Sequence, residues 1–205
     1  MKLVLASASP RRRELLDAIG LGFEVRPVEL DEAAIAGTQP PLDAAVTVAT
    51  AKARAANAPP DVVVLAADTM VVLDDQILGK PVDPSDARRM LAALRGRMHT
   101  VVTGVTVRTP DSEWTAAVES QVRMRAYRDA EIDAYLADGG GRDKAGSYGV
   151  QDEPFVPVEA IEGCYCNVMG LPLWSAYRLL REAGCTAPRR PGDVLSRCAV
   201  CPMRT

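Results

Sequence analysis

Apolar runs of strand length alternate along the chain with segments in which apolar residues recur at helical spacing. The strand-like runs cover residues 2–7, 23–30, 62–78, 99–109, 114–126 and 155–161. The helical segments cover about residues 10–20, 42–57, 84–95, 129–138 and 171–184. Alternation of this kind is typical of the α/β class, so the sequence predicts an α/β fold.

Capping signals mark the starts of three helices. Ser9 and Asp83 each precede a proline, the residue that fits the first helical position. Asp129 is placed to cap the fourth helix, which the glycines after residue 138 end. We expect all three side chains to accept hydrogen bonds from free backbone N–H groups.

Composition favours a single domain followed by a tail. The chain has 205 residues, of which 48% are hydrophobic, so it can bury a substantial core. The helical pattern fades after Gly184 and gives way to prolines, basic residues and turn formers. The sequence therefore predicts one domain over residues 1–187 and a poorly ordered tail over residues 188–205.

Charge and targeting signals narrow the functional classes. The formal net charge of -3 gives no general reason to expect a nucleic-acid or membrane partner, so any anion site must be local. The N-terminal apolar run is too short for a signal peptide, and no later segment approaches the ~18 apolar residues of a membrane span. We expect a cytoplasmic protein.

Five cysteines lie in the last quarter of the chain, at positions 164, 166, 185, 198 and 201. An odd number suits a reducing compartment better than a disulfide framework. Cys198 and Cys201 have C-x-x-C spacing, but no second pair stands at zinc-ligand spacing and His99 is far away in the sequence. The sequence predicts neither a metal nor a redox role for this motif.

Three arginines occupy the first turn of the first helix. Arg11, Arg12 and Arg13 follow Ser9 and Pro10 directly, although the positive end of the helix dipole disfavours cations there. A bound polyanion would reverse this, because backbone N–H groups and guanidinium groups both bind phosphate. A solvated helix start is the alternative, and the run of three favours phosphate binding.

Asp68 interrupts the apolar run of residues 62–78. A buried carboxylate without a partner is costly, so Asp68 must meet a cation, a metal or a cleft. The alternative is a structural aspartate that ends one strand through local hydrogen bonds. Ligand clefts usually open at strand ends in α/β sheets, and this favours a functional role.

Four further charged residues are ambiguous on their own. Lys52 stands four residues after Val48, near the apolar face of its helix, where it could simply extend its charge to solvent. Lys80 lies in a Gly-Lys-Pro turn, and Lys144 lies among small residues that would let a ligand approach the backbone. Glu32 by itself indicates nothing specific.

Eight short motifs, taken in order, closely resemble the Maf family of nucleotide pyrophosphatases. They are SASPRRREL, LDE, AKA, ADTMVV, ILGKP, GRMHTVVTGV, DKAGSYGVQ and NVMGLPL, and the resemblance spans nearly all of residues 3–181. The sequence departs from the family at two places. Cysteines flank Tyr165 where the family usually has small residues or serine, and the tail after about Pro188 has no counterpart.

The resemblance implies an inosine-triphosphate-pyrophosphatase-like α/β fold, with a mixed, elongated sheet flanked by helices and an active-site cleft. It also implies a cytoplasmic homodimer and cleavage of a nucleoside triphosphate to monophosphate and pyrophosphate with Mg²⁺ or Mn²⁺. Asp68 matches the proposed general base, and Glu32 with Asp68 are the expected metal ligands. The matching substrate-binding positions are Ser9, Arg12, Arg13, Lys52, Thr69, Lys80, Lys144 and Gln151.

The pair Asp68-Thr69 resembles the dTTP/UTP pyrophosphatase branch, whereas Asp-Gln at this place resembles the 7-methyl-GTP branch. Arg12, Thr69 and Gln151 match the positions linked to that choice. The resemblance therefore implies a house-cleaning hydrolase of dTTP and UTP, with modified pyrimidine nucleotides as further candidates. The alternatives are a 7-methyl-GTP pyrophosphatase and a non-catalytic, nucleotide-binding regulator of septum formation.

Overall fold

A computed structural model describes residues 2–204. Within that range seven strands form one sheet in the order β2-β1-β3-β5-β6-β7, and β4 pairs with β3 outside this path. β1 runs parallel to β2 and β3, whereas the other pairs are antiparallel, so the mixed sheet is confirmed. The strands are β1 (Lys2–Leu5), β2 (Glu24–Val25), β3 (Val62–Leu73), β4 (Gln76–Leu78), β5 (Met98–Arg108), β6 (Glu113–Met124) and β7 (Val158–Glu162).

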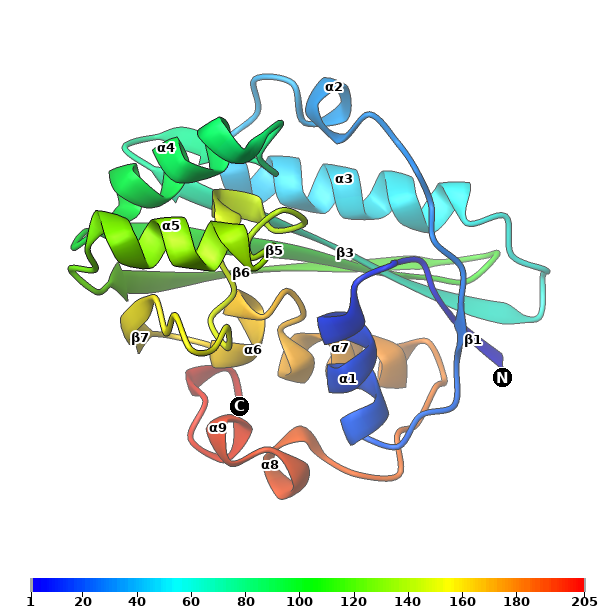
Figure 1. Ribbon diagram of the computed structural model, residues 1–205. Coiled ribbons are helices and arrows are strands. Elements are labelled where there is room, and N and C mark those ends of the chain that lie inside the picture. The colour runs from blue at the N-terminus through cyan, green and yellow to red at the C-terminus, as the bar shows by residue number, and fades with distance from the viewer. Residues whose placement is uncertain (1, 205) are drawn as a thin grey trace.

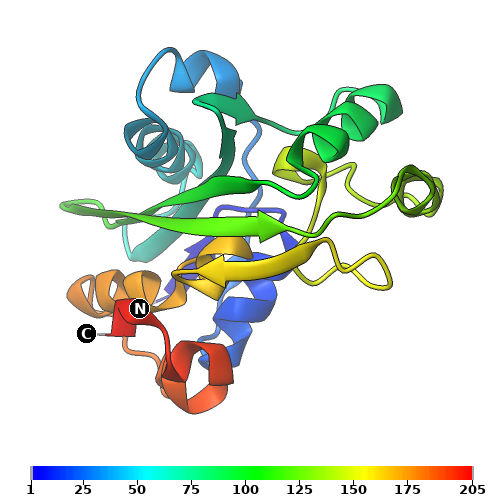
Figure 2. The ribbon, with the colours of Figure 1, turned by 90° about the vertical axis from the view of Figure 1, so that its left-hand side faces the viewer.

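Helices cover both faces of the sheet (Figure 1 and Figure 2), so the α/β class is confirmed. α1 (Pro10–Ala18) and α7 (Leu173–Glu182) pack on one face, and α3 (Pro41–Ala55) packs on the other. α4 (Pro84–Leu94) and α5 (Asp129–Ala137) lie side by side. The shorter helices are α2 (Glu32–Ala36), α6 (Tyr165–Val168), α8 (Pro191–Val194) and α9 (Ser196–Ala199). Among residues 2–204, no helix combines the length and apolar character needed to cross a membrane.

Two of the three predicted helix caps are confirmed. The side chains of Ser9 and Asp83 each accept a hydrogen bond from the backbone N–H three residues on. The third prediction is wrong, because α5 has Arg128 at the cap position, where its backbone N–H donates to the Glu131 carboxylate at 2.9 Å. Asp129 lies in the first turn and pairs with an arginine outside the helix instead.

Two predicted strands are shorter in the structure. Residues 23–30 contribute only β2, and the run 155–161 does not enter the sheet until Val158. Phe155 contributes to the apolar run because it packs in the core and not because it lies in a strand. Its ring stacks on Tyr135 with centroids 4.5 Å apart. The structure also contains α2, a short helix beginning at Glu32 that the sequence pattern does not predict.

Small residues let α3 approach the sheet closely. Gly104 of β5 faces the helix, and a Cβ atom there would lie 2.4 Å from the backbone of Ala45. Lys52 lies on the same buried side of α3. The close packing therefore brings a lysine side chain against β3. The buried residues of this helix are Ala44, Ala45, Val48, Ala49, Lys52 and Ala53.

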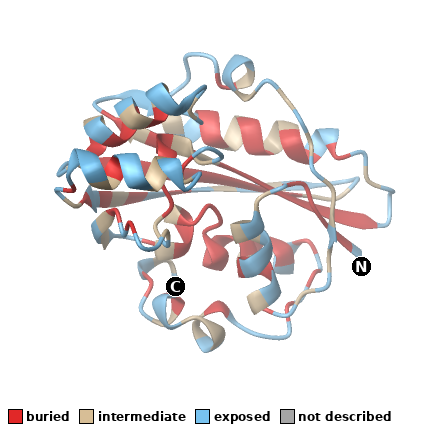
Figure 3. Cartoon of the chain, in the orientation of Figure 1, coloured by how far each residue is buried: buried red, intermediate tan, exposed pale blue. Residues whose placement is uncertain are grey.

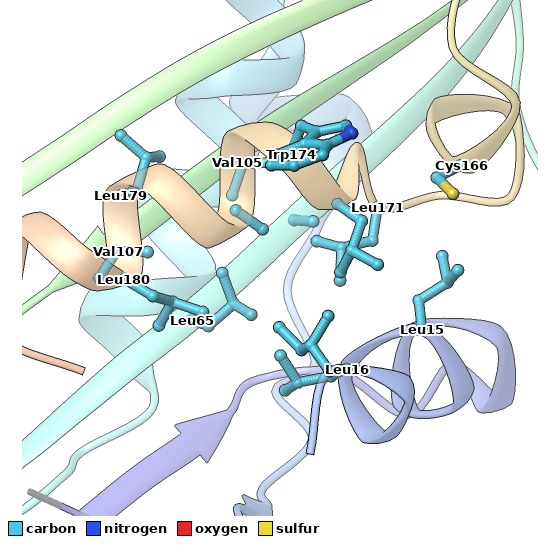
Figure 4. Close-up of a cluster of buried hydrophobic side chains, with 14 of the residues drawn as sticks. Leu15, Leu16, Leu65, Val105, Val107, Cys166, Leu171, Trp174, Leu179 and Leu180 are labelled. Carbon is cyan, nitrogen blue, oxygen red and sulfur yellow. The ribbon is translucent and has the colours of Figure 1, made fainter. Parts of the chain in front are cut away.

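The C-terminal segment, residues 185–204, packs against the domain and differs from the poorly ordered tail that composition predicts. Cys198 and Cys201 are buried in the same apolar cluster as Trp174, whose Nε1 donates to the Cys198 carbonyl at 2.9 Å. Figure 3 shows buried residues concentrated between sheet and helices, and Figure 4 shows part of this cluster. Elements of four residues are too short for hydrophobic periodicity to reveal, so the order of this segment comes from tertiary contacts.

Candidate active site

A cavity of about 840 Å³ opens beside β3 where this strand changes neighbours. β1 pairs with β3 as far as Leu65, and β4 begins its pairing at Val71. Asp68 and Thr69 lie between these points and line the cavity. The alternative, a structural aspartate that ends a strand, is wrong, since Asp68 lies within β3 and is paired with β5 on the other side. The cavity opens because one edge of the strand changes its neighbour.

Lys52 joins two of the carboxylates that line this cavity, those of Glu32 and Asp68. Its Nζ lies 2.7 Å from Asp68 Oδ1 and 2.7 Å from Glu32 Oε1. Lys52 and Asp68 are only 6% and 5% exposed. Burial opposes the ionisation of Glu32, but the hydrogen bond and charge of Lys52, with the charges of Lys80 and Arg12, outweigh it and lower the pKa of Glu32. The expectation that Asp68 meets a cation is confirmed.

Arg12 reaches from the start of α1 to the far side of the cavity. Its Nε donates to the Gly170 carbonyl at 2.8 Å, Nη1 to Ser7 Oγ at 3.1 Å and Nη2 to Thr69 Oγ1 at 3.1 Å. Burial lowers the pKa of Arg12, while the charge of Asp68 acts in the opposite direction. A guanidinium has five N–H donors, so these three bonds leave two for a ligand.

A chain of hydroxyl groups continues from Arg12 into the core. The Thr103 hydroxyl donates to the Asn167 carbonyl at 3.1 Å, and it lies 3.0 Å from the Thr69 hydroxyl. Because Thr103 has one proton and uses it on Asn167, the Thr69 hydroxyl donates to Thr103 and accepts from Arg12. Thr69 therefore meets a ligand as a hydrogen-bond acceptor.

Known proteins resemble this chain in sequence over most of its length. Residues 2–183 match the family model described as Maf-like protein. This chain belongs to the Maf family. Curated relatives named dTTP/UTP pyrophosphatase include one from Anaeromyxobacter dehalogenans (strain 2CP-C), 49% identical over 91% of this chain and 96% of the relative, and one from Thermomicrobium roseum, 46% identical over 90% and 85%.

Solved structures similar to this Maf protein include a HAM1 protein from Coxiella burnetii, with a TM-score of 0.45 and 16% identity over 72% of this chain and 79% of that one. A nucleoside-triphosphatase, or dITP/XTP pyrophosphatase, from Mycobacterium abscessus has a TM-score of 0.39 and 18% identity over 62% and 76%. The family assignment rests on the sequence matches.

Most residues that the Maf pattern singles out line the cavity, and two do not. Arg13 is exposed and stands apart from the residues that line it. Gln151 is also exposed and lines a second cavity of about 440 Å³, which Lys144 borders as well. Those that line the main cavity are Ser9, Arg12, Glu32, Lys52, Asp68, Thr69, Lys80 and Lys144.

Two residues near this Maf site, Ser7 and Thr103, were not predicted from the sequence. Arg11, which belongs to the predicted run of three arginines, lines the cavity although the family pattern points to Arg13, because the orientation of the helix decides which arginines face inward. Ser7 accepts from Arg12, and its signal was the Ser-x-Ser spacing. Thr103 gave no signal, because a threonine within a β run is usual and its contacts come from distant segments.

Proposed function

We propose that this Maf protein hydrolyses dTTP and UTP to the nucleoside monophosphate and pyrophosphate, and so removes surplus or modified pyrimidine triphosphates. The observation that carries the proposal is the buried Lys52–Asp68 pair, which borders a cavity also lined by Arg11, Arg12 and Lys80. A triphosphate has about four negative charges at neutral pH, which these cations and a divalent metal ion together would offset. The names of the relatives support pyrimidine triphosphates as substrates.

Asp68 is the general base in the proposed mechanism. Lys52 binds its Oδ1 at 2.7 Å, and we assign Oδ2 to the attacking water. As that water attacks the α-phosphorus, its proton passes to Asp68 and the bond to the departing pyrophosphate breaks. Arg11, Arg12 and Lys80 stabilise the charge that develops on the leaving group. Asp68 then returns the proton to solvent.

Mg²⁺ or Mn²⁺ is the proposed cofactor. Among residues 2–204, no three His, Cys, Asp or Glu side chains are grouped so that they could hold a metal ion. Glu32 and Asp68 nevertheless fit Mg²⁺, which often takes one or two carboxylates from the protein and its other ligands from phosphates and water. When bound, the ion would offset phosphate charge and polarise the bond that breaks.

A panel of triphosphates tests the proposal. UTP, dTTP, CTP, GTP and 7-methyl-GTP are each incubated at one concentration with Mg²⁺ or Mn²⁺, and pyrophosphate and monophosphate are measured. We expect the highest kcat/KM for UTP and dTTP. If 7-methyl-GTP is cleaved fastest, the result would favour a 7-methyl-GTP pyrophosphatase. Tight UTP binding without product would favour a nucleotide-binding regulator of septum formation.

The oligomeric state needs a separate measurement. The proposed enzyme is a cytoplasmic homodimer, as the family resemblance implies. Light scattering on the purified protein would give the mass of the particle, and a mass equal to one chain would contradict the dimer.

A further inference from the structure

Four of the five cysteines meet where α6 contacts the C-terminal segment. Cys164 and Cys166 lie at the start of α6, Cys198 lies in α9, and Cys201 follows it. Their exposed fractions range from 1% to 7%, and all four belong to one apolar cluster. The proposed reaction uses none of them.

Cys166 and Cys198 bring their sulfur atoms together from distant parts of the chain. The two Sγ atoms lie 3.2 Å apart, although the residues are 32 positions apart. The S–S distance in a disulfide is about 2.05 Å, so a small local movement of the two side chains would suffice to form one. Trp174 holds the Cys198 carbonyl at 2.9 Å and thereby fixes the backbone that presents this thiol. Figure 4 shows Cys166 and Trp174 in the same cluster.

The thiols of this group differ in acidity. The hydrogen bond from Cys166 lowers the pKa of Cys198 and raises that of Cys166. Burial raises the pKa of Cys164 to about 12. Cys198 is therefore more readily converted than Cys164 or Cys166 to the thiolate, which is the form that reacts with peroxides.

Metal binding is the other chemistry that four cysteines can perform. The geometry favours cross-linking, because within residues 2–204 no three metal-binding side chains are grouped to hold an ion. The sulfurs of Cys166 and Cys198 pair closely instead, whereas Cys164 Sγ accepts a hydrogen bond from the Asn167 backbone N–H at 3.4 Å.

We propose that Cys166 and Cys198 form a reversible disulfide when the protein meets a hydroperoxide. The Cys198 thiolate attacks one peroxide oxygen, the O–O bond breaks, and the leaving hydroxide gains a proton and departs as water. The Cys166 sulfur then attacks the resulting sulfenic acid, the S–S bond forms, the S–O bond breaks, and a second water leaves with the Cys166 proton. In total, two thiols lose two electrons and hydrogen peroxide is reduced to two waters.

A small oxidant can reach this pair through local opening. α8 and α9 have four residues each, and short elements of this kind open at low free energy compared with the sheet. A dithiol reverses the reaction by thiol–disulfide exchange.

The cross-link would tie the C-terminal segment to the wall of the main cavity. The chain runs directly from α6 into Met169 and Gly170, which line that cavity, and the Gly170 carbonyl accepts a hydrogen bond from Arg12. A disulfide stabilises the fold chiefly by restricting the unfolded chain. The oxidised protein should therefore unfold at a higher temperature than the reduced protein.

The experiment treats the full-length protein with hydrogen peroxide and then with dithiothreitol, and follows peptide maps and thermal unfolding. We expect a peptide linked through Cys166 and Cys198 and a rise in Tm of roughly 5–10 °C, both reversed by the dithiol. Cys166→Ser and Cys198→Ser should lack the link and the rise. Cys185→Ser is the matched control, since Cys185 is buried in the same cluster, and it should keep both.

Three results would overturn the proposal. The first is that the parent protein forms no disulfide, and the second is that it links Cys164 to Cys201 instead. The third is that it carries a zinc ion bound by these thiols. If one of the two serine variants does not fold, the other still tests the proposal. The peptide map of the parent protein requires neither variant.

Discussion

Charged side chains form networks in two regions of the molecule, the main cavity and the outer surface of α4 and α5. On the surface, Arg88 of α4 lies 2.8 Å from Asp133 of α5, and their side chains are 43% and 57% exposed. In the cavity, the Lys52 side chain is only 8% exposed and binds two carboxylates at equally short distances. Similar distances thus occur in very different solvent environments.

The difference in burial separates what the two networks do. Exposed pairs are screened by water and salt, so they contribute little to stability. Buried charges are costly to desolvate, and apolar residues of similar size would often be at least as stable. Retention of the cavity network is therefore better explained by ligand chemistry than by stability.

Asp68→Asn should give the largest effect. The amide keeps the shape of the side chain but cannot accept the proton, so we expect kcat to fall roughly 10²–10⁴-fold. The protein should stay folded because Lys52 keeps Glu32 as its partner. Turnover, UTP binding and thermal unfolding measured on one preparation check this. A folded variant with the parent rate would remove Asp68 from the mechanism.

Lys52→Met tests the buried network through stability. Two carboxylates would then face each other in the cavity without their shared cation, which typically costs about 3–5 kcal/mol. We expect Tm to fall by roughly 10 °C. Thermal unfolding at neutral pH provides the measurement, and an unchanged Tm would mean that the buried pair behaves like the exposed ones.

Arg12→Ala and Arg13→Ala form a matched pair from one helical turn. Arg12 lines the cavity and Arg13 does not, so only the first should lower kcat/KM, by roughly 10–100-fold for the loss of a charge-assisted contact. Steady-state kinetics with UTP measure both. Equal losses in the two variants would contradict the orientation of α1.

Thr103→Val tests the hydroxyl chain behind Arg12. The variant frees the Thr69 hydroxyl to turn and leaves the Asn167 carbonyl without this donor, so kcat/KM should fall roughly five- to tenfold. Thr106→Val on the same strand is the control, because Thr106 is equally buried and bonds to Thr50. The control should keep parent kinetics, and Thr103→Ser should restore them.

Asp129→Asn should have the smallest effect. Its carboxylate binds Arg95 on the exposed surface, where screening is strong. We expect Tm to change by no more than about 2 °C and kcat/KM to stay at the parent value. A larger drop in Tm at low salt than at high salt would show how much screening matters there.

The sequence predicts the regular parts of the fold well. Long apolar runs gave β3, β5 and β6, and the cap residues Ser9 and Asp83 marked two helix starts. Local signals suffice there because hydrophobic period and backbone hydrogen bonding act over a few residues. They failed for α2 and the C-terminal segment, where short elements are held by contacts with distant parts of the chain.

The site was predictable in its residue types more than in its geometry. Asp68 and Arg12 were recognisable because a carboxylate within an apolar run and a cation at the start of a helix are both unfavourable. The family motifs, taken in order, pointed to Glu32, Lys52 and Lys80. Which arginine turns inward and which hydroxyl supports it depend on packing between segments far apart in the sequence. A single sequence carries no direct record of those distances.

The interval of β3 between Leu65 and Val71 has a consequence for evolution. Along this interval one edge of β3 has no strand partner in the sheet formed by residues 2–204, and Asp68, Thr69 and Met70 line the cavity there, so a ligand at this edge would meet peptide groups as well as side chains. Peptide groups are the same in every residue type except proline, and mutation cannot easily remove them. A part of the binding surface built in this way tolerates sequence drift, while selection acts on the few side chains that tune the choice of ligand.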